Sequence, residues 1–85
     1  MNSKMQYQKE QIKEKEKERV EQIRQKIDEG IQKDGYFFIK MKNEEEIWGK
    51  KYNIEYAENE AYIIITSLDK STKIIIKVKD ILYAF

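Results

Sequence analysis

The chain has 85 residues, 17 of them basic and 16 acidic, and it contains neither cysteine nor histidine. This composition excludes disulfides and catalysis by thiolate or histidine, and it leaves almost no means of holding a structural zinc ion. The net charge of +1 gives no long-range field that would gather nucleic acid or acidic membranes, so an anion site would have to be local. No apolar run reaches membrane-spanning length, and the first residues lack the apolar core of a signal peptide. We therefore expect a cytoplasmic protein without a membrane partner.

Residues 1–33 are predicted to form an N-terminal helix, because their composition favours helices and no breaker precedes Gly30. Before about residue 12 this helix is polar, and a long coiled coil is disfavoured. Near its end, apolar residues recur three and four positions apart and draw one stripe that should pack on a sheet. The stripe consists of Val20, Ile23, Ile27 and Ile31.

Residues 34–85 are predicted to form five antiparallel strands. Asp34 and Gly35 make a turn before the first strand, residues 36–42, whose odd positions form one apolar face. The second strand covers about residues 46–56 and contains Gly49, which should mark a sharp bend or a close backbone approach. The last strand covers residues 81–85.

Residues 61–78 are predicted to form a hairpin in which two isoleucine runs, 63–65 and 74–76, face each other across a polar turn. Successive side chains of a strand point to opposite faces, so these runs place apolar groups on both faces of the sheet. Neither face can then be left in water. The packed part has only about 50 residues, near the lower limit for unaided folding, and we therefore expect a homo-oligomer.

The second strand carries a family resemblance. Ile47, Gly49, four further residues, Ile54 and Glu55 resemble the first Sm motif. Residues 76–81 are similar to the fourth strand, short turn and fifth strand of Sm-like barrels, and also to the carboxyl half of the YolD-like proteins of Gram-positive bacteria and their phages. The resemblance implies that residues 34–85 form a small Sm-like barrel that pairs edge strands into a ring or dimer.

This chain departs from the RNA-binding members of the Sm type. Residues 77–80 replace the segment that those rings place before the last strand, and Lys51 stands where the family prefers an apolar residue. RNA chaperone activity is therefore not implied. The predicted fold class is α+β, with an N-terminal helix followed by a five-stranded, strongly bent antiparallel sheet or a small Sm-like barrel. The whole chain is one domain.

One constellation has the chemistry of a binding site. Aromatic side chains alternate with lysines on the even positions of the first two strands, and aromatic planes beside ammonium groups suit nucleobases and phosphates. The alternative is that this face is buried under the helix stripe or a neighbouring subunit. The candidate ligand-binding residues are Tyr36, Phe38, Lys40, Trp48, Lys50, Tyr52 and Tyr56.

No catalytic arrangement is recognisable, since the acidic run 44–46 lies in a predicted turn where solvated charges are expected, and no cofactor or metal is predicted. Two functions remain open. The first is a non-enzymatic, homo-oligomeric binding module for a nucleotide-like or RNA ligand, such as a phage-type sponge for cyclic-nucleotide immune signals in the host cytoplasm. The second is a protein-interaction module or phage inhibitor that blocks or bridges a protein partner.

Overall fold

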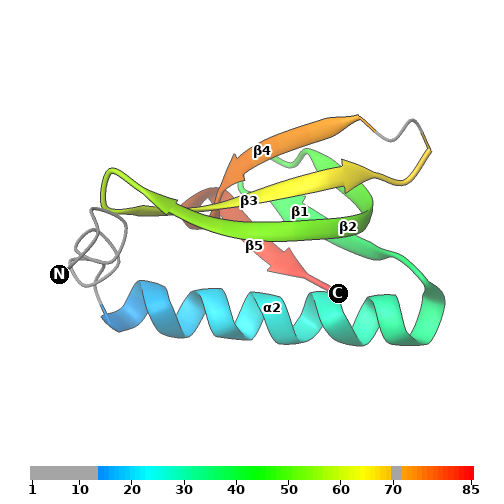
Figure 1. The fold of residues 1–85 in the computed structure, drawn as a ribbon, viewed down its shortest axis with the longest axis horizontal. Coiled ribbons are helices and arrows are strands. Elements are labelled where there is room, and N and C mark those ends of the chain that lie inside the picture. The colour runs from blue at the N-terminus through cyan, green and yellow to red at the C-terminus, as the bar shows by residue number, and fades with distance from the viewer. Residues whose placement is uncertain (1–13, 70–71) are drawn as a thin grey trace, which may run out of the picture.

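The computed structural model describes residues 14–69 and 72–85. Helix α2 (Glu14–Asp34) comes first and lies along one side of the sheet in Figure 1. Within these described residues the order is one helix followed by five strands, which confirms the predicted α+β fold class. The elements after α2 are β1 (Phe37–Met41), β2 (Glu46–Ala57), β3 (Glu60–Ser67), β4 (Lys73–Lys77), the 3-10 turn η1 (Val78–Asp80) and β5 (Ile81–Ala84).

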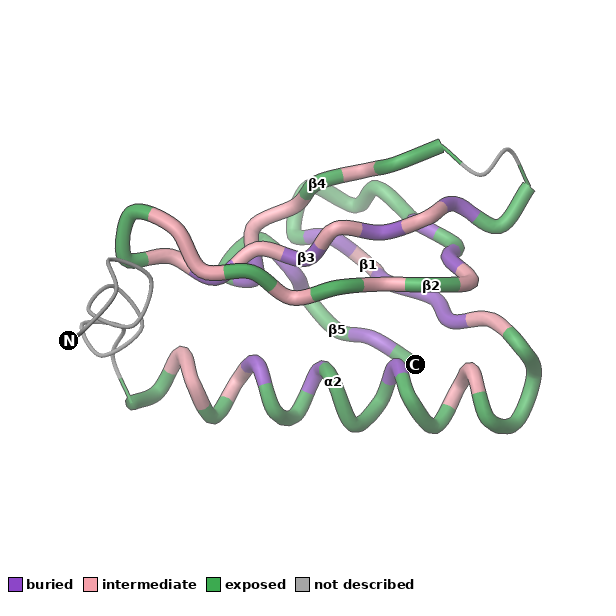
Figure 2. The backbone as a smooth tube through the Cα atoms, viewed as in Figure 1, coloured by how far each residue is buried: buried purple, intermediate pink, exposed green. Residues whose placement is uncertain are grey.

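Helix α2 packs on the sheet through the apolar stripe that its sequence predicts. Val20, Ile23 and Ile27 are buried, and Ile31 is partly buried against the same core. In Figure 2 the buried positions of α2 lie on the side that faces the sheet. The helix ends at Gly35, which has a φ of +81° and donates its backbone N–H to the Ile31 carbonyl at 2.8 Å. The polar part expected before about residue 12 lies outside the described residues.

The five strands form one open sheet in the order β4-β3-β2-β1-β5. Every neighbouring pair is antiparallel. Strands β4 and β5 lie at opposite edges, so the sheet is not closed, and the barrel form of the expected fold is wrong for the single chain. The sheet therefore presents two unpaired edges, one along β4 and one along β5.

Strand β2 contains a β-bulge directly after Gly49. Gly49 lies opposite Ser67 of β3, whereas Lys51 lies opposite Thr66, so Lys50 is an extra residue in the ladder. Because side chains alternate between faces, one extra residue reverses the faces of all positions that follow it. The two halves of β2 thus present their even positions on opposite faces of the sheet.

The lack of a side chain at Gly49 leaves room for two core residues. A Cβ atom at this position would lie 2.4 Å from Phe37 Cζ and 2.6 Å from Ile65 Cγ2. The predicted bend is confirmed by the bulge. The close approach comes from side chains of β1 and β3 rather than from another backbone, so Gly49 is a core position.

The two isoleucine runs pair in the predicted way, but they do not bury both faces of the sheet. Ile63 and Ile65 are 0 % exposed, whereas Ile75 is 66 % exposed. Within the single chain α2 covers the inner face alone, so the expectation that neither face is left in water stays a prediction that needs another copy to cover the outer face. The partners across the strands are Ile63 with Ile76, Ile64 with Ile75, and Ile65 with Ile74. Lys70 and Ser71 of the connecting turn lie outside the described residues.

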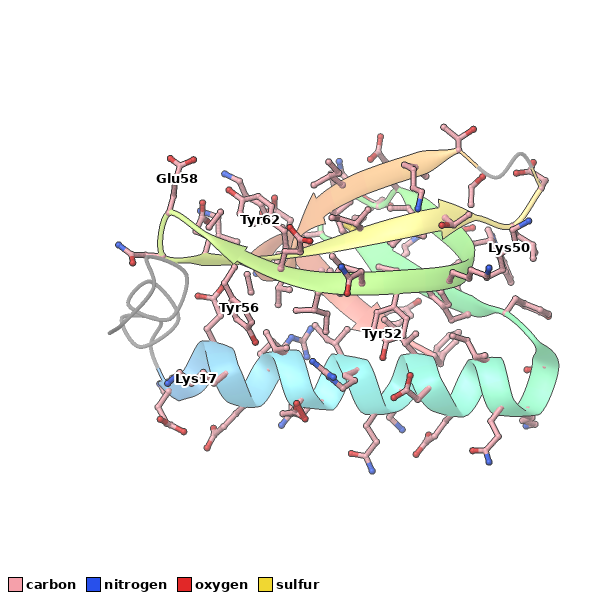
Figure 3. The ribbon with its side chains drawn as sticks, in the orientation of Figure 1. Lys17, Lys50, Tyr52, Tyr56, Glu58 and Tyr62 are labelled. Atoms are coloured by element: carbon pink, nitrogen blue, oxygen red, sulfur yellow. The ribbon has the colours of Figure 1, made fainter. Side chains whose placement is uncertain are left out.

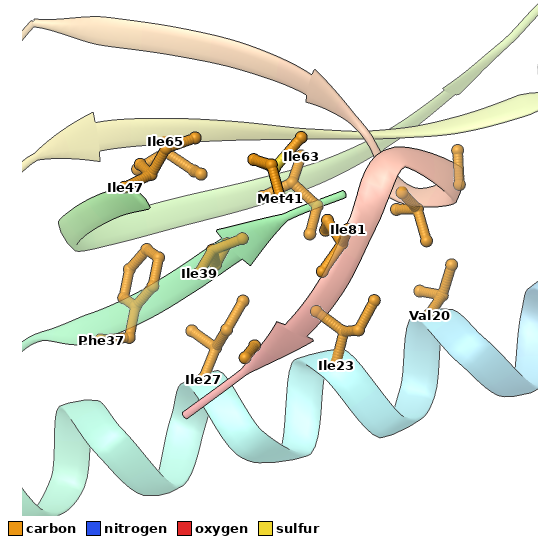
Figure 4. Close-up of a cluster of buried hydrophobic side chains, with 13 residues drawn as sticks. Val20, Ile23, Ile27, Phe37, Ile39, Met41, Ile47, Ile63, Ile65 and Ile81 are labelled. Atoms are coloured by element: carbon orange, nitrogen blue, oxygen red, sulfur yellow. The ribbon is translucent and has the colours of Figure 1, made fainter. Parts of the chain in front are cut away.

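The core lies between α2 and the inner face of the sheet. Figure 4 shows the side chains of α2, β1, β3 and β5 meeting there. Phe37 and Ile39 from β1 are 0 % exposed, as predicted for the odd face of this strand, and Ile81 from β5 is 1 % exposed. The even face of β1 points the other way and carries the candidate site.

Candidate functional site

The β-bulge divides the candidate residues between two faces of the sheet. Trp48 lies opposite Phe38, on the outer face. After the bulge, Tyr52 lies opposite the buried Ile65 and Tyr56 opposite the buried Ala61, on the inner face. Figure 3 shows Tyr52 and Tyr56 pointing from β2 toward α2. The prediction that one face carries all these rings is therefore wrong, because it assumed an uninterrupted alternation along β2.

Five aromatic rings, here called the aromatic cluster, gather on the face of β1, β2 and β5 that points away from the core. The Phe38 ring lies 4.7 Å from Trp48 and 5.3 Å from Phe85, measured between centroids, and the pair Phe38–Phe85 is stacked. Tyr36 lies 5.7 Å from Trp48, and Tyr83 is stacked on Phe85 at 5.2 Å. These distances are typical of favourable ring contacts. The rings of the aromatic cluster thus pack against one another on the outer face of the sheet.

The aromatic cluster faces solvent. Phe38 is only 8 % exposed because the other rings cover it, whereas Trp48 is 45 % and Phe85 62 % exposed. The stripe of α2 packs on the opposite face, against Phe37 and Ile39. The alternative that the helix stripe buries this face is therefore wrong for Trp48. Contiguous exposed apolar surface of this kind makes the aromatic cluster a candidate interaction site.

A groove runs between the aromatic cluster and the second half of α2, with a volume of about 440 Å³. Its aromatic wall combines residues of β1, β2 and the end of β5, and its other wall belongs to the helix. The helix contributes two lysines and two carboxylates, so the lining residues carry no net charge. The groove is lined by Lys26, Glu29, Gly30, Lys33, Asp34, Tyr36, Phe38, Trp48 and Phe85.

The lysines predicted for the site are not gathered in this groove. Lys40 Nζ lies 3.2 Å from Glu46 Oε2, in an ion pair on the outer face. Lys50 is the extra residue of the bulge and does not line the groove. The cations that do line the groove are Lys26 and Lys33 of α2. The structure therefore brings together three of the five predicted rings, Tyr36, Phe38 and Trp48, and places lysines of α2 beside them instead of the predicted lysines.

Tyr52 locks α2 onto the sheet instead of facing a ligand. Its ring meets Phe37 edge-on at 6.0 Å, and its hydroxyl donates a hydrogen bond to Asp28 Oδ1 of the helix at 2.6 Å. Burial of the hydroxyl, together with the hydrogen bond to the Asp28 carboxylate, raises the pKa of Tyr52 to about 12. Tyr56 is likewise packed against the core. Both tyrosines are structural residues.

The Tyr52–Asp28 hydrogen bond makes stability depend on pH in the alkaline range. The folded pKa lies above the unfolded value of 10.0, so the contribution is complete below pH 10 and is lost as pH rises toward about 12. Tyr52→Phe should lower the free energy of unfolding by about 1 kcal/mol at neutral pH. Urea titrations of both proteins from pH 8 to pH 12 test this, and the difference should shrink only above pH 10. A difference that stays constant to pH 12 would contradict the assignment.

Of the nine residues that line the groove, the sequence predicted three, namely Tyr36, Phe38 and Trp48. Tyr83 and Phe85 are two positions apart at the end of the chain, as Tyr36 and Phe38 are at the first strand. This spacing places two rings on one face of a strand and could have predicted that Tyr83 and Phe85 belong to the aromatic cluster. Lys26 and Lys33 are seven positions apart in α2 and fall on one side of the helix. The sequence does not reveal which strand pairs with the other edge of β1. In the structure this strand is β5, which brings Tyr83 and Phe85 to Phe38.

Comparison with known proteins gives no significant match to a protein-family model, a curated protein or a solved structure. The resemblance to Sm-like and YolD-like proteins thus stays a prediction. Within residues 14–69 and 72–85, no helix combines the length and apolar character needed to cross a membrane.

Proposed function

We propose that the protein is a non-enzymatic binding module that holds the base of a nucleotide-like or RNA ligand in the groove beside the aromatic cluster. The observation that carries the proposal is the exposed row of Trp48 and Phe85 over Phe38. Exposed aromatic planes bind bases by stacking, and this contribution needs no particular base sequence.

Stacking of a base on the aromatic rings should contribute more to the affinity than attraction of its phosphate, because the groove has little net charge. Its two lysines are balanced by two carboxylates, so the lining attracts anions weakly. A volume of about 440 Å³ is in the usual range for a small-molecule site. Lys26 and Lys33 would contact a phosphate attached to the bound base, while Glu29 and Asp34 would accept hydrogen bonds from its amino groups.

We expect Trp48→Ala to fold normally but to bind the ligand more weakly. Because the Trp48 side chain is 45 % exposed, its truncation should leave a folded protein. The variant should lose about 1–3 kcal/mol of binding free energy toward short single-stranded oligonucleotides and nucleoside monophosphates, because a stacking partner is removed. Fluorescence titration of Trp48 in the parent protein and calorimetry of the variant measure this.

Leu68→Ala is the matched control, since Leu68 is 39 % exposed and lies outside the groove. It should bind like the parent protein. An absorbance excess at 260 nm that survives high salt during purification would give independent support. Folded Trp48→Ala that binds as tightly as the parent would sink the nucleobase proposal.

The proposed module is a homo-oligomer. Two open sheet edges and the exposed Ile75 leave backbone groups and apolar surface without cover from the described part of the chain. Light scattering tests this, because a mass near 10.3 kDa at micromolar concentration would show a monomer and contradict the proposal.

A protein-interaction module is the second candidate, and Ile75 is the observation that favours it. Ile75 is 66 % exposed beside Ile64 on the outer face, next to the open edge of β4. Exposed isoleucines bind proteins well but offer nothing to a nucleobase. Capture of a protein partner that Ile75→Lys abolishes and Trp48→Ala does not would favour this function.

A further inference from the structure

A basic hollow of about 410 Å³ lies between the first turns of α2 and the end of the sheet, away from the aromatic groove. It is built by segments that are far apart in the sequence. Lys15 and Arg19 come from α2, Lys42 follows β1, and Lys79 belongs to η1. Its apolar wall is formed by Val78, Ile81 and Leu82.

The charges in this hollow are unbalanced, unlike those of the aromatic groove. Four basic side chains meet one carboxylate, Glu16, in a chain whose net charge is only +1. Glu60 lies nearby and its Oε1 is 2.9 Å from Lys79 Nζ, which offsets one cation. Glu60 also raises the pKa of Lys79 through their hydrogen bond, so this lysine stays charged at neutral pH. The carboxylate of Asp80 also acts on Lys79, and one positive charge remains when Glu16, Glu60 and Asp80 are counted against the four cations.

The cations are held by ordered parts of the fold. Arg19 Nη2 donates to the carbonyl oxygens of Leu82 at 2.7 Å and Ile81 at 3.1 Å. A guanidinium has five N–H donors, so Arg19 keeps donors for a ligand. The Lys42 backbone N–H donates to the Asp80 carbonyl at 2.8 Å, which ties the end of β1 to η1. These contacts fix the Arg19 guanidinium and the backbone that carries Lys42 before any ligand arrives.

The geometry favours a compact anion with several charges. An extended acidic peptide spaces the carboxylates of one face about 7 Å apart, so few of them could enter one hollow. Phosphate groups carry more charge in less volume and accept several hydrogen bonds from Arg and Lys. We therefore propose that the basic hollow formed by Lys15, Arg19, Lys42 and Lys79 is a binding site for phosphate groups.

This site is independent of the nucleobase proposal. The hollow and the aromatic groove share none of their lining residues. The nearest helix residues of the two sites, Arg19 of the hollow and Lys26 of the groove, are separated by about 10 Å along the axis of α2, at 1.5 Å per residue. A single phosphate attached to a base in the groove would not reach the hollow, so the two sites can be tested separately.

Calorimetry of the full chain with inorganic triphosphate at low ionic strength tests the proposal. Lys15 and Lys42 are exposed, and the double variant Lys15→Gln/Lys42→Gln removes two charges without touching the contacts of Arg19. Lys51→Gln/Lys73→Gln removes the same charge from exposed lysines elsewhere. We expect the parent and the control to bind alike, and the hollow variant to bind about tenfold more weakly.

A second titration with a short single-stranded oligonucleotide identifies the source of the phosphate. Tighter binding of triphosphate indicates a free polyphosphate group, and tighter binding of the oligonucleotide indicates a nucleic acid backbone. In both cases the loss must be confined to the hollow variant, with thermal melts showing that all variants fold. Absence of binding of both probes to the parent, or equal weakening in the control, would overturn the proposal. Failure of Trp48→Ala to affect binding would leave it intact.

Discussion

Replacing Gly49 by alanine should lower the free energy of unfolding by about 3 kcal/mol. The added Cβ would lie 2.4 Å from Phe37 Cζ and 2.6 Å from Ile65 Cγ2, distances that real Cβ atoms essentially never show. Phe37 and Ile65 are both 0 % exposed, so neither has room to move aside. Urea denaturation followed by circular dichroism measures the loss. For a domain of this size, such a loss is a large part of the total stability.

Two further variants separate overpacking from other effects at Gly49. Gly35→Ala meets no atom within 4 Å, and its cost comes from the φ of +81° alone, about 1 kcal/mol. Phe37→Leu should partly rescue Gly49→Ala, because it removes the ring atoms of Phe37 that collide with the new Cβ and leaves only the contact with Ile65 Cγ2. Losses that simply add in the double variant would show that the clash with Phe37 is not the cause.

Ile63→Lys and Ile75→Lys should differ sharply although they lie on neighbouring paired strands. Ile63 is 0 % exposed in the core, so a lysine there buries a charge without a partner and should abolish folding. Ile75 is 66 % exposed on the outer face, so the lysine remains in water and the single chain should fold. Circular dichroism and thermal melting of the two purified variants give the comparison.

Light scattering of Ile75→Lys extends the same test to assembly. If copies associate through the outer face at β4, this variant should be a folded protein of lower mass than the parent. Unfolding of Ile75→Lys at every concentration would contradict its exposed position in the chain. Normal folding of Ile63→Lys would contradict the assignment of the inner face.

The helix and the strand order of the hairpins were predictable because each depends on a local period. Val20, Ile23 and Ile27 repeat at helical spacing, and the stripe they form is the one that docks. The isoleucine runs sit on either side of a short turn, which leaves one reasonable pairing. Local patterns of this kind carry most of the fold class.

The candidate site was only half predictable because it depends on contacts between distant segments. A bulge inserts a single extra residue into one strand, and nothing in the pattern around Lys50 marks it as that residue. Without the bulge, Trp48 and Tyr52 fall on one face, and this is the prediction that was wrong. The basic hollow depends on α2, β1 and η1 meeting in space, which no spacing along the chain reveals.

The bulge also says which changes related sequences can accept. Deleting one residue between Gly49 and Tyr52 would remove the extra position and turn Tyr52, Ile54 and Tyr56 away from the core. Substitutions at Lys50 or Lys51 would leave Tyr52, Ile54 and Tyr56 on the inner face. In any set of homologues we therefore expect the number of residues between Gly49 and Tyr52 to be kept more strictly than their identity. Over evolution, the segment would accumulate substitutions but reject insertions and deletions.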